Sequence, residues 1–156
     1  SKPIIVIRKL EDSPEWLDRR LVTAYIHTIY STSHVRGGMT LRLHPGQSLP
    51  QQLEDFLEEQ NCNTCAIITA WNPGSVRQTV SQNTRNNRKL EADLRKVSAL
   101  VLPGSNIDPD NRWPSEESFF AFGIFAENAV QLGRKYGQNA IVWLEKSRQP
   151  ELWWLL

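Results

Sequence analysis

The sequence has 156 residues, 40% of them hydrophobic and 22% charged, which fits one globular domain and excludes a disordered or fibrous chain. Its formal net charge of +1 excludes a global field that would attract nucleic acid or an anionic membrane. With no apolar run near the roughly 18 residues of a spanning helix, no signal-peptide pattern and too few cysteines for a disulfide framework, we expect a soluble cytoplasmic protein.

The N-terminal third of the chain predicts a β-hairpin that follows a short helix. Ser13 and Pro14 suit the N-cap and first position of a helix, while β-branched and aromatic residues dominate after Val22. Gly37 and Gly38 supply a turn. The expected elements are a strand or an extended arm at 4–7, a helix of one or two turns from Ser13, a strand at 22–30 and a strand at 39–44.

The remainder of the chain alternates between strands and helices. The expected elements are a helix at 49–60, a strand at 64–70, a helix at 81–97, strands at 99–102 and 118–123, a helix at 125–136, a strand at 140–144, and a tail at 152–155 that forms an edge strand or a packed extension. This order predicts an α/β fold: a single mixed β-sheet with packed helices and an N-terminal β-hairpin, in one domain over residues 1–156.

The stretch from Ala66 to Gly74 organises this prediction. A buried strand ends at Trp71 and Asn72, because Pro73 disfavours a helical Asn72 and Gly74 tolerates positive φ. If strand 99–102 runs in the same direction, ligands are expected at the edge where both strands end. The features that then converge on this edge are Trp71-Asn72, Asn83 and Asn87, Gly104, Trp113, residues 116–118, and Gln138.

Asn83 and Asn87 lie on the inward stripe of the predicted helix 81–97, one turn apart. A buried amide needs hydrogen-bond partners, since an unpaired one costs about 1–3 kcal/mol. Two interpretations follow. The amides could brace the loop 105–116 and the Asn-Pro-Gly turn, or they could present donors and acceptors to a ligand together with Asn72.

Four groups of residues carry a family resemblance: 69–73, Asn83 and Asn87 with Leu90, 113–118, and 136–141. Together they resemble the bacterial domain of unknown function 3293 family. The resemblance covers roughly residues 20–145 and leaves an aromatic tail at 146–156. It implies no established activity, cofactor or partner.

Glu116 and Glu117 are the candidates for acid–base chemistry. Adjacent strand residues point to opposite faces, so only one of the two can face a crevice. A carboxyl beside Trp113 and Phe119 could have a raised pKa, and if one of the two is catalytic, we favour Glu117. The alternative is a structural carboxylate that accepts backbone amides or pairs with an arginine.

The remaining candidates are weaker. Arg77 or Arg85 near a helix N-terminus could hold an anionic group, although we favour a solvated helix face for this segment. Cys62 and Cys65 have CxxC spacing without a second pair, and we predict no metal site from them or from the three histidines.

We therefore expect a small polar or anionic ligand, such as a nucleotide, sugar or phosphate compound, at the sheet edge where strands 64–70 and 99–102 end. If the protein is an enzyme, we expect Glu117 to act as an acid or base. The expected ligand-binding residues are Trp71, Asn72, Asn83, Asn87, Trp113, Glu116, Ser118 and Gln138. The alternative is an interaction or regulatory protein in which these residues are structural and the aromatic tail, if exposed, favours a homodimer.

Overall fold

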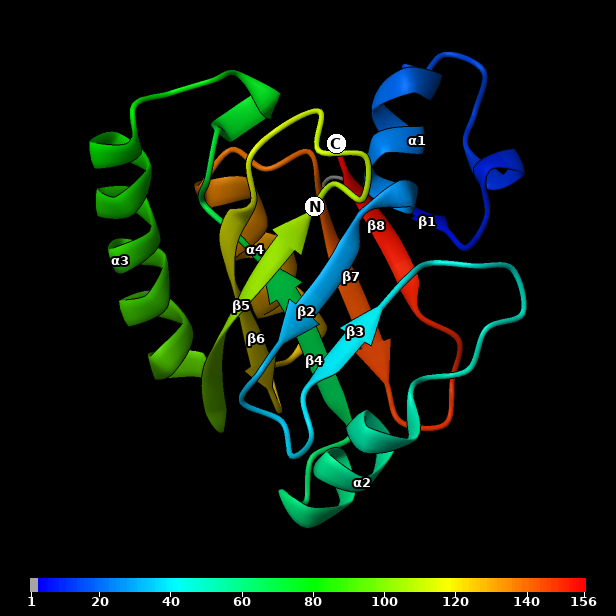
Figure 1. The fold of residues 1–156 in the computed structure, drawn as a ribbon, viewed down its shortest axis with the longest axis vertical. Helices are drawn as coiled ribbons and strands as arrows, with labels where there is room; N and C mark the ends of the chain where they lie inside the picture. Colours follow the sequence, from blue (N-terminus) through cyan, green and yellow to red (C-terminus); the bar gives the residue numbers. More distant parts are fainter. Residues whose placement is uncertain (1–2) are drawn as a thin grey trace.

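Eight strands form one curled sheet in which every pair of neighbours is antiparallel, in the order β1-β8-β7-β4-β6-β5-β2-β3 (Figure 1). The computed structural model describes residues 3–156. The strands are β1 Ile4–Ile7, β2 Ile29–Thr32, β3 Met39–Leu41, β4 Thr64–Ile68, β5 Leu100–Ile107, β6 Glu116–Phe122, β7 Ala140–Glu145 and β8 Glu151–Leu155.

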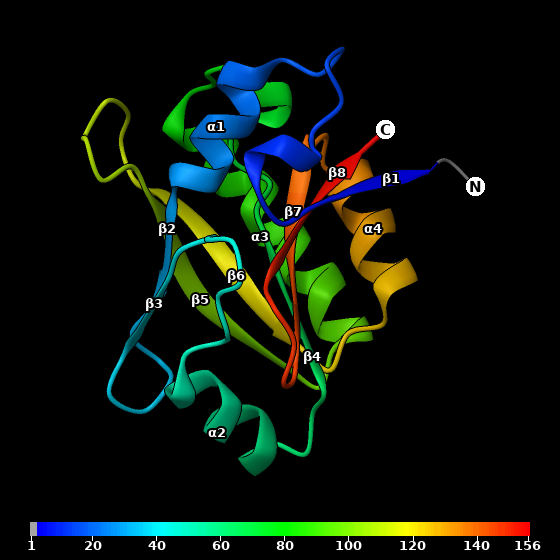
Figure 2. The same cartoon turned by 90° about the vertical axis from the view of Figure 1, so that its right-hand side faces the viewer.

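Four α-helices and two short 3-10 helices connect these strands. They are η1 Leu10–Asp12, α1 Arg19–His27, α2 Gln51–Glu59, η2 Pro73–Ser75, α3 Val80–Val97 and α4 Ala126–Lys135. One apolar cluster joins α3 and α4 to one face of the sheet, and another joins α1 and α2 to the other face. Figures 1 and 2 show α1 at one end of the sheet and α2 at the opposite end.

The predicted α/β class with one sheet and packed helices is confirmed, and β2 and β3 form the hairpin, with Tyr30 opposite Leu41. The sheet is antiparallel rather than mixed, because β6 lies between β4 and β5, the two strands that were expected to be parallel neighbours. The predicted strands 64–70 and 99–102 do run in the same direction, as β4 and β5, with β6 paired between them. Within residues 3–156, no helix is both long and apolar enough to cross a membrane.

The segment predicted as a strand at 22–30 is helical as far as His27, so that prediction was wrong over most of its length. Asp18 is the N-cap, and its carboxylate accepts hydrogen bonds from the amides of Arg20 and Leu21. Ser13 is not an N-cap, because its hydroxyl donates to the carbonyl of Leu10. The cap at Asp18 and helical spacing of the apolar residues outweigh the β-branched composition.

The predicted strand end at Pro103-Gly104 was also wrong, because β5 continues to Ile107. Pro103 lies outside the residues of β5 that pair with β2, where a missing N–H is tolerated. Gly104 is needed for close packing, since a Cβ there would lie 2.6 Å from the Phe120 ring. The longer strand places Asn106 opposite Glu116.

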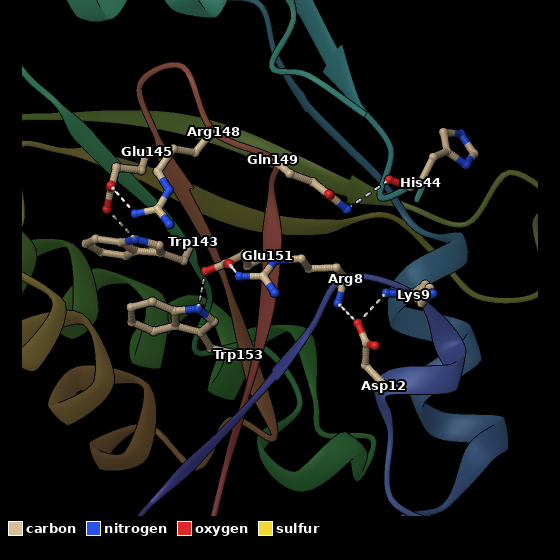
Figure 3. Close-up of polar contacts among 10 residues, drawn as sticks. All are labelled: Arg8, Lys9, Asp12, His44, Trp143, Glu145, Arg148, Gln149, Glu151 and Trp153. Carbon is tan, nitrogen blue, oxygen red and sulfur yellow. Dashed lines mark hydrogen bonds and ion pairs between the residues drawn. The ribbon is translucent and has the colours of Figure 1, made fainter. Parts of the chain in front are cut away.

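The aromatic tail forms β8, an internal strand between β1 and β7. The Trp153 indole stacks on Trp143 with ring centroids 4.6 Å apart, and Figure 3 shows the two rings side by side with their N–H groups directed to Glu151 and Glu145. Trp154 packs edge-on against Tyr25. The tail is therefore part of the core and provides no exposed aromatic surface for a homodimer.

Candidate functional site

A cavity of about 1090 Å³ lies at the sheet edge where β4 and β5 end and β6 begins. Residues of α1 line it opposite the sheet, and Figure 2 shows this helix over the end of the sheet. The turn after β4 and the loop before β6 contribute the remaining walls. Of the predicted site residues, this cavity brings together Trp71, Asn72, Asn83, Trp113, Glu116 and Gln138.

The Asn72 turn is held in an unusual conformation by hydrogen bonds. Asn72 has φ of 45° and Ser75 has φ of 62°, both in the left-handed region that costs a non-glycine residue about 1–2 kcal/mol. The Asn72 amide N–H donates to Asn83 Oδ1, and Asn83 Nδ2 donates to Asn72 Oδ1, each at 2.8 Å. The Gly74 amide donates to the carbonyl of Gly137. These contacts fix the side chain of Asn72 at the cavity wall.

Asn87 is fully buried and lies outside the cavity lining. Its Oδ1 accepts from the Ala70 amide at 2.8 Å, and its Nδ2 donates to the carbonyl of Glu117 at 2.9 Å. Asn87 therefore ties the end of β4 to the start of β6. Since Asn83 is bonded in the same way to Asn72, both helix amides have the geometry of the bracing alternative.

Glu116, not Glu117, faces the cavity. The strand alternates, so Glu116 shares its face with Phe120, whereas Glu117 points to the α3 side, where its Oε1 lies 3.5 Å from Asn87 Nδ2. Ser118 is on the face of Glu116 but is fully buried behind it and does not line the cavity. In the described part of the chain, the Ser118 hydroxyl has no hydrogen-bond partner.

The environment of Glu116 favours its neutral form. Burial raises the pKa of this carboxyl to about 7, and a hydrogen bond from Asn72 Nδ2, at 3.4 Å, only partly opposes the rise. No ion pair reaches Glu116 from any other residue between 3 and 156. A carboxyl with this pKa is present in both protonation states at neutral pH.

Two arginines, Arg77 and Arg112, line the cavity. The guanidinium of Arg112 pairs with Asp110 at 3.1 Å and Asp108 at 3.7 Å, and His27 Nε2 lies 3.0 Å from Asp110. Arg77 also lines the cavity and, among the described residues, has no ion pair. Of these two arginines, Arg77 is therefore the one without a competing carboxylate among the described residues.

Trp71, Trp113 and Gln138 complete the predicted rim. Both indoles are half-buried and line the cavity, and Gln138 Nε2 donates to the carbonyl of Trp71 at 3.2 Å. Gly104 does not reach this rim, because it lies inside β5 opposite Ser118. The edge thus contains most, but not all, of the features that strand direction predicts.

The polar lining residues that the sequence prediction missed include Tyr25, Tyr30 and Asn106. Tyr25 was assigned to a strand rather than to α1, and Asn106 to a loop rather than to β5. Asp18 as a cap was the available signal for α1. Pro103 and Gly104 are typical turn residues and predicted that the strand ends before Asn106. No local sequence pattern indicated that β5 continues to Ile107.

The cysteines lie away from the cavity. Cys65 is buried in β4, and burial raises the pKa of its thiol well above the ordinary value. Cys62 is also buried and free. Residues 3–156 contain no group of three or more His, Cys, Asp or Glu side chains that could hold a metal ion.

Residues 68–141 match the family model described as "Protein of unknown function (DUF3293)", which confirms the resemblance seen in the sequence. The matched region contains Asn72, Asn83, Glu116 and Gln138, but not the part of the cavity formed by α1. No curated protein and no solved structure matches the chain.

Proposed function

We propose that this chain, whose residues 68–141 match the family model of the proteins of unknown function DUF3293, binds a small polar or anionic organic ligand in the cavity beside Asn72 and Glu116. One observation carries the proposal: a largely buried carboxyl faces a cavity of about 1090 Å³ with one long hydrogen bond and no ion pair among the described residues. Burying such a group costs free energy unless it is paired, so a ligand that pairs with it is favoured.

The cavity wall gives each remaining residue a role in this proposal. The indoles of Trp71 and Trp113 contact the flat or apolar part of the ligand. Asn72 and Gln138 contribute polar groups at the rim, and Arg77 attracts an anionic substituent at the mouth. Asn83 and Asn87 position the wall through their bonds to protein, and Glu117 and Ser118 have no direct contact with the ligand.

Glu116 also defines what an enzymatic activity would require. General acids and bases work best when their pKa is near the operating pH, and Glu116 meets this condition. In an enzyme of this family Glu116, rather than Glu117, would transfer the proton. The competing function is an interaction module, and the hydrogen bonds of Asn83 and Asn87 to other protein groups favour it. It does not explain why the Glu116 carboxyl faces a cavity without an ion pair among the described residues.

A thermal-shift screen against nucleosides, nucleotides, sugars and phosphorylated metabolites tests the proposal. A ligand at about 100 times its Kd stabilises the folded state by about 2.7 kcal/mol, which raises the melting temperature by several degrees. We expect such a rise for the unaltered protein and for Glu117→Gln, and a smaller one for Glu116→Gln. If no compound raises the melting temperature, or Glu116→Gln responds like Glu117→Gln, the proposal is wrong.

A further inference from the structure

Three side chains form the inner wall of the cavity on adjacent strands. Asn106 of β5 lies opposite Glu116 of β6 on one side and opposite Tyr30 of β2 on the other. Residues opposite each other in a sheet project from the same face, so these three side chains are neighbours. All three line the cavity.

Each of these three side chains has an oxygen that can accept a hydrogen bond. Asn106 Oδ1 is buried and, within the part of the chain that the structure covers, has no hydrogen-bond partner. Among residues 3–156, only Asn72 donates to the Glu116 side chain, through a long hydrogen bond. The Tyr30 hydroxyl has already donated its proton to the carbonyl of Tyr25 at 2.8 Å, so only its lone pairs are available.

We infer that the ligand of the proposed site is a planar nitrogen heterocycle that donates neighbouring N–H groups of one edge to Asn106 and Glu116. The inference depends on the proposed function and specifies its ligand. A buried acceptor left without a donor is unfavourable, and a pair of them on adjacent strands suits donors that are adjacent in the ligand.

The rest of the lining selects a flat ring over a sugar. Trp71, Trp113 and Tyr25 offer aromatic surfaces, and Leu21, Ile67 and Val142 are apolar. A sugar carries hydroxyls around its whole ring, and most of them would meet apolar wall without a partner. A heterocycle gathers its donors on one edge and leaves two apolar faces for the aromatic side chains.

The ionisation of Glu116 agrees with this ligand. Burial raises its pKa to about 7 in the free protein, whereas N–H donors stabilise the carboxylate. Binding near neutral pH therefore lowers the pKa of Glu116 and releases a proton to solvent. The heat of binding should consequently depend on the ionisation enthalpy of the buffer.

Calorimetric titration with guanosine, cytidine, adenosine and pterin tests the inference, with glucose and glucose 6-phosphate as compounds of the other classes. We expect at least one of the four heterocycles to bind and both sugars to fail. Binding of a sugar alone would overturn the inference while the proposed function stands. Absence of binding by every compound in this titration and in the thermal-shift screen would overturn both.

Altering the ligand and the protein separately and together then tests whether an N–H group of the ligand donates to Asn106. The heterocycle that binds is compared with its N-methylated form, in which the donor edge is blocked, on the unaltered protein and on Asn106→Leu. Methylation should weaken binding at least about tenfold for the unaltered protein and much less for Asn106→Leu, because the acceptor is already absent. Equal effects of methylation on both proteins would contradict the inference.

The folding of Asn106→Leu can be checked from its melting temperature without ligand. Asn106→Leu removes a buried polar atom that has no partner among the described residues, so its melting temperature without ligand should not fall. Asn86→Ala, a change on α3 outside the cavity lining, serves as the control and should retain both affinity and the effect of methylation. Loss of binding in Asn86→Ala as well would also count against the inference.

Discussion

Asn72 and Asn83 hold each other through two reciprocal hydrogen bonds of 2.8 Å, one through the backbone amide of Asn72 and one through its side-chain oxygen. Asn83 is buried on α3, while Asn72 occupies a left-handed conformation in the turn after β4. The pair therefore joins the helix to the wall of the cavity. The same side-chain oxygen of Asn72 also accepts from the amide of Gln78, just before α3.

Replacing Asn83 with alanine should destabilise the fold and loosen the cavity wall. The Asn72 amide loses its acceptor, which costs about 1–3 kcal/mol of unfolding free energy. Chemical denaturation measures this loss. Asn86→Ala is the control, because Asn86 lies on a half-exposed part of α3 and, in the described part of the chain, accepts only a long hydrogen bond from Gln82. Equal unfolding free energies for the two variants would show that the reciprocal bonds contribute nothing.

Replacing Asn87 with alanine should cost a similar amount of stability without changing ligand affinity. Asn87 binds the Ala70 amide and the Glu117 carbonyl but does not line the cavity. Affinity of the folded protein for any compound found by thermal shift, measured by calorimetry, should fall for Asn83→Ala and stay within a few-fold for Asn87→Ala. A large loss of affinity in Asn87→Ala would place that residue in the binding machinery, against the structure.

The pKa of Glu116 predicts a pH dependence of stability. The carboxyl titrates near its ordinary value of 4.5 in the unfolded chain and at about 7 in the folded protein. Between these values the folded state binds more protons, so the unfolding free energy falls as pH rises from 4.5 to 7 and changes no further from this group above 7.

Glu116→Gln should remove that decline. Glutamine resembles the neutral carboxyl, so the variant should equal the unaltered protein near pH 4 and exceed it in stability at pH 8. Denaturant titrations at a series of pH values measure the difference. Glu117→Gln, a substitution of the exposed neighbour, should follow the unaltered protein. A Glu116→Gln variant that is less stable at pH 8 would refute the raised pKa.

Gly104→Ala should destabilise the sheet beside the cavity. The added Cβ would lie 2.6 Å from the Phe120 ring and 2.8 Å from the carbonyl oxygen of Ser31, and the second contact involves backbone that cannot turn away. We expect a loss of about 1–3 kcal/mol in thermal or chemical unfolding. Ser105→Ala, the next residue of β5, is the matched control and should lose less.

The direction of the chain through the sheet could be predicted from the sequence because turn and cap residues mark where elements end. Pro73 and Gly74 marked the end of β4, and the inward stripe of Leu90 and Leu94 marked the buried face of α3. Strand order could not be predicted in this way. Only long-range pairing places β6 between β4 and β5, and no local signal encodes it.

The candidate site was predicted in part for the same reason. Trp71, Asn72 and Gln138 follow from the ends of strands and helices, which local patterns reveal. The choice between Glu116 and Glu117 depends on strand register, and a shift of one residue exchanges the faces. Asn106 was missed because Gly104 was read as a turn residue that ends the strand. Gly104 instead lies inside β5, where a side chain would collide with the ring of Phe120, a residue distant in the sequence.

The tryptophan indole signals in a nitrogen–proton NMR spectrum test the central claim most directly. During titration with a compound that raises the melting temperature, the signals of Trp71 and Trp113 should shift because both rings line the cavity. Those of Trp143 and Trp153 should stay in place, because their N–H groups are bonded to Glu145 and Glu151 away from the cavity (Figure 3). Shifts at Trp143 and Trp153 with none at Trp71 and Trp113 would contradict a ligand site at Glu116.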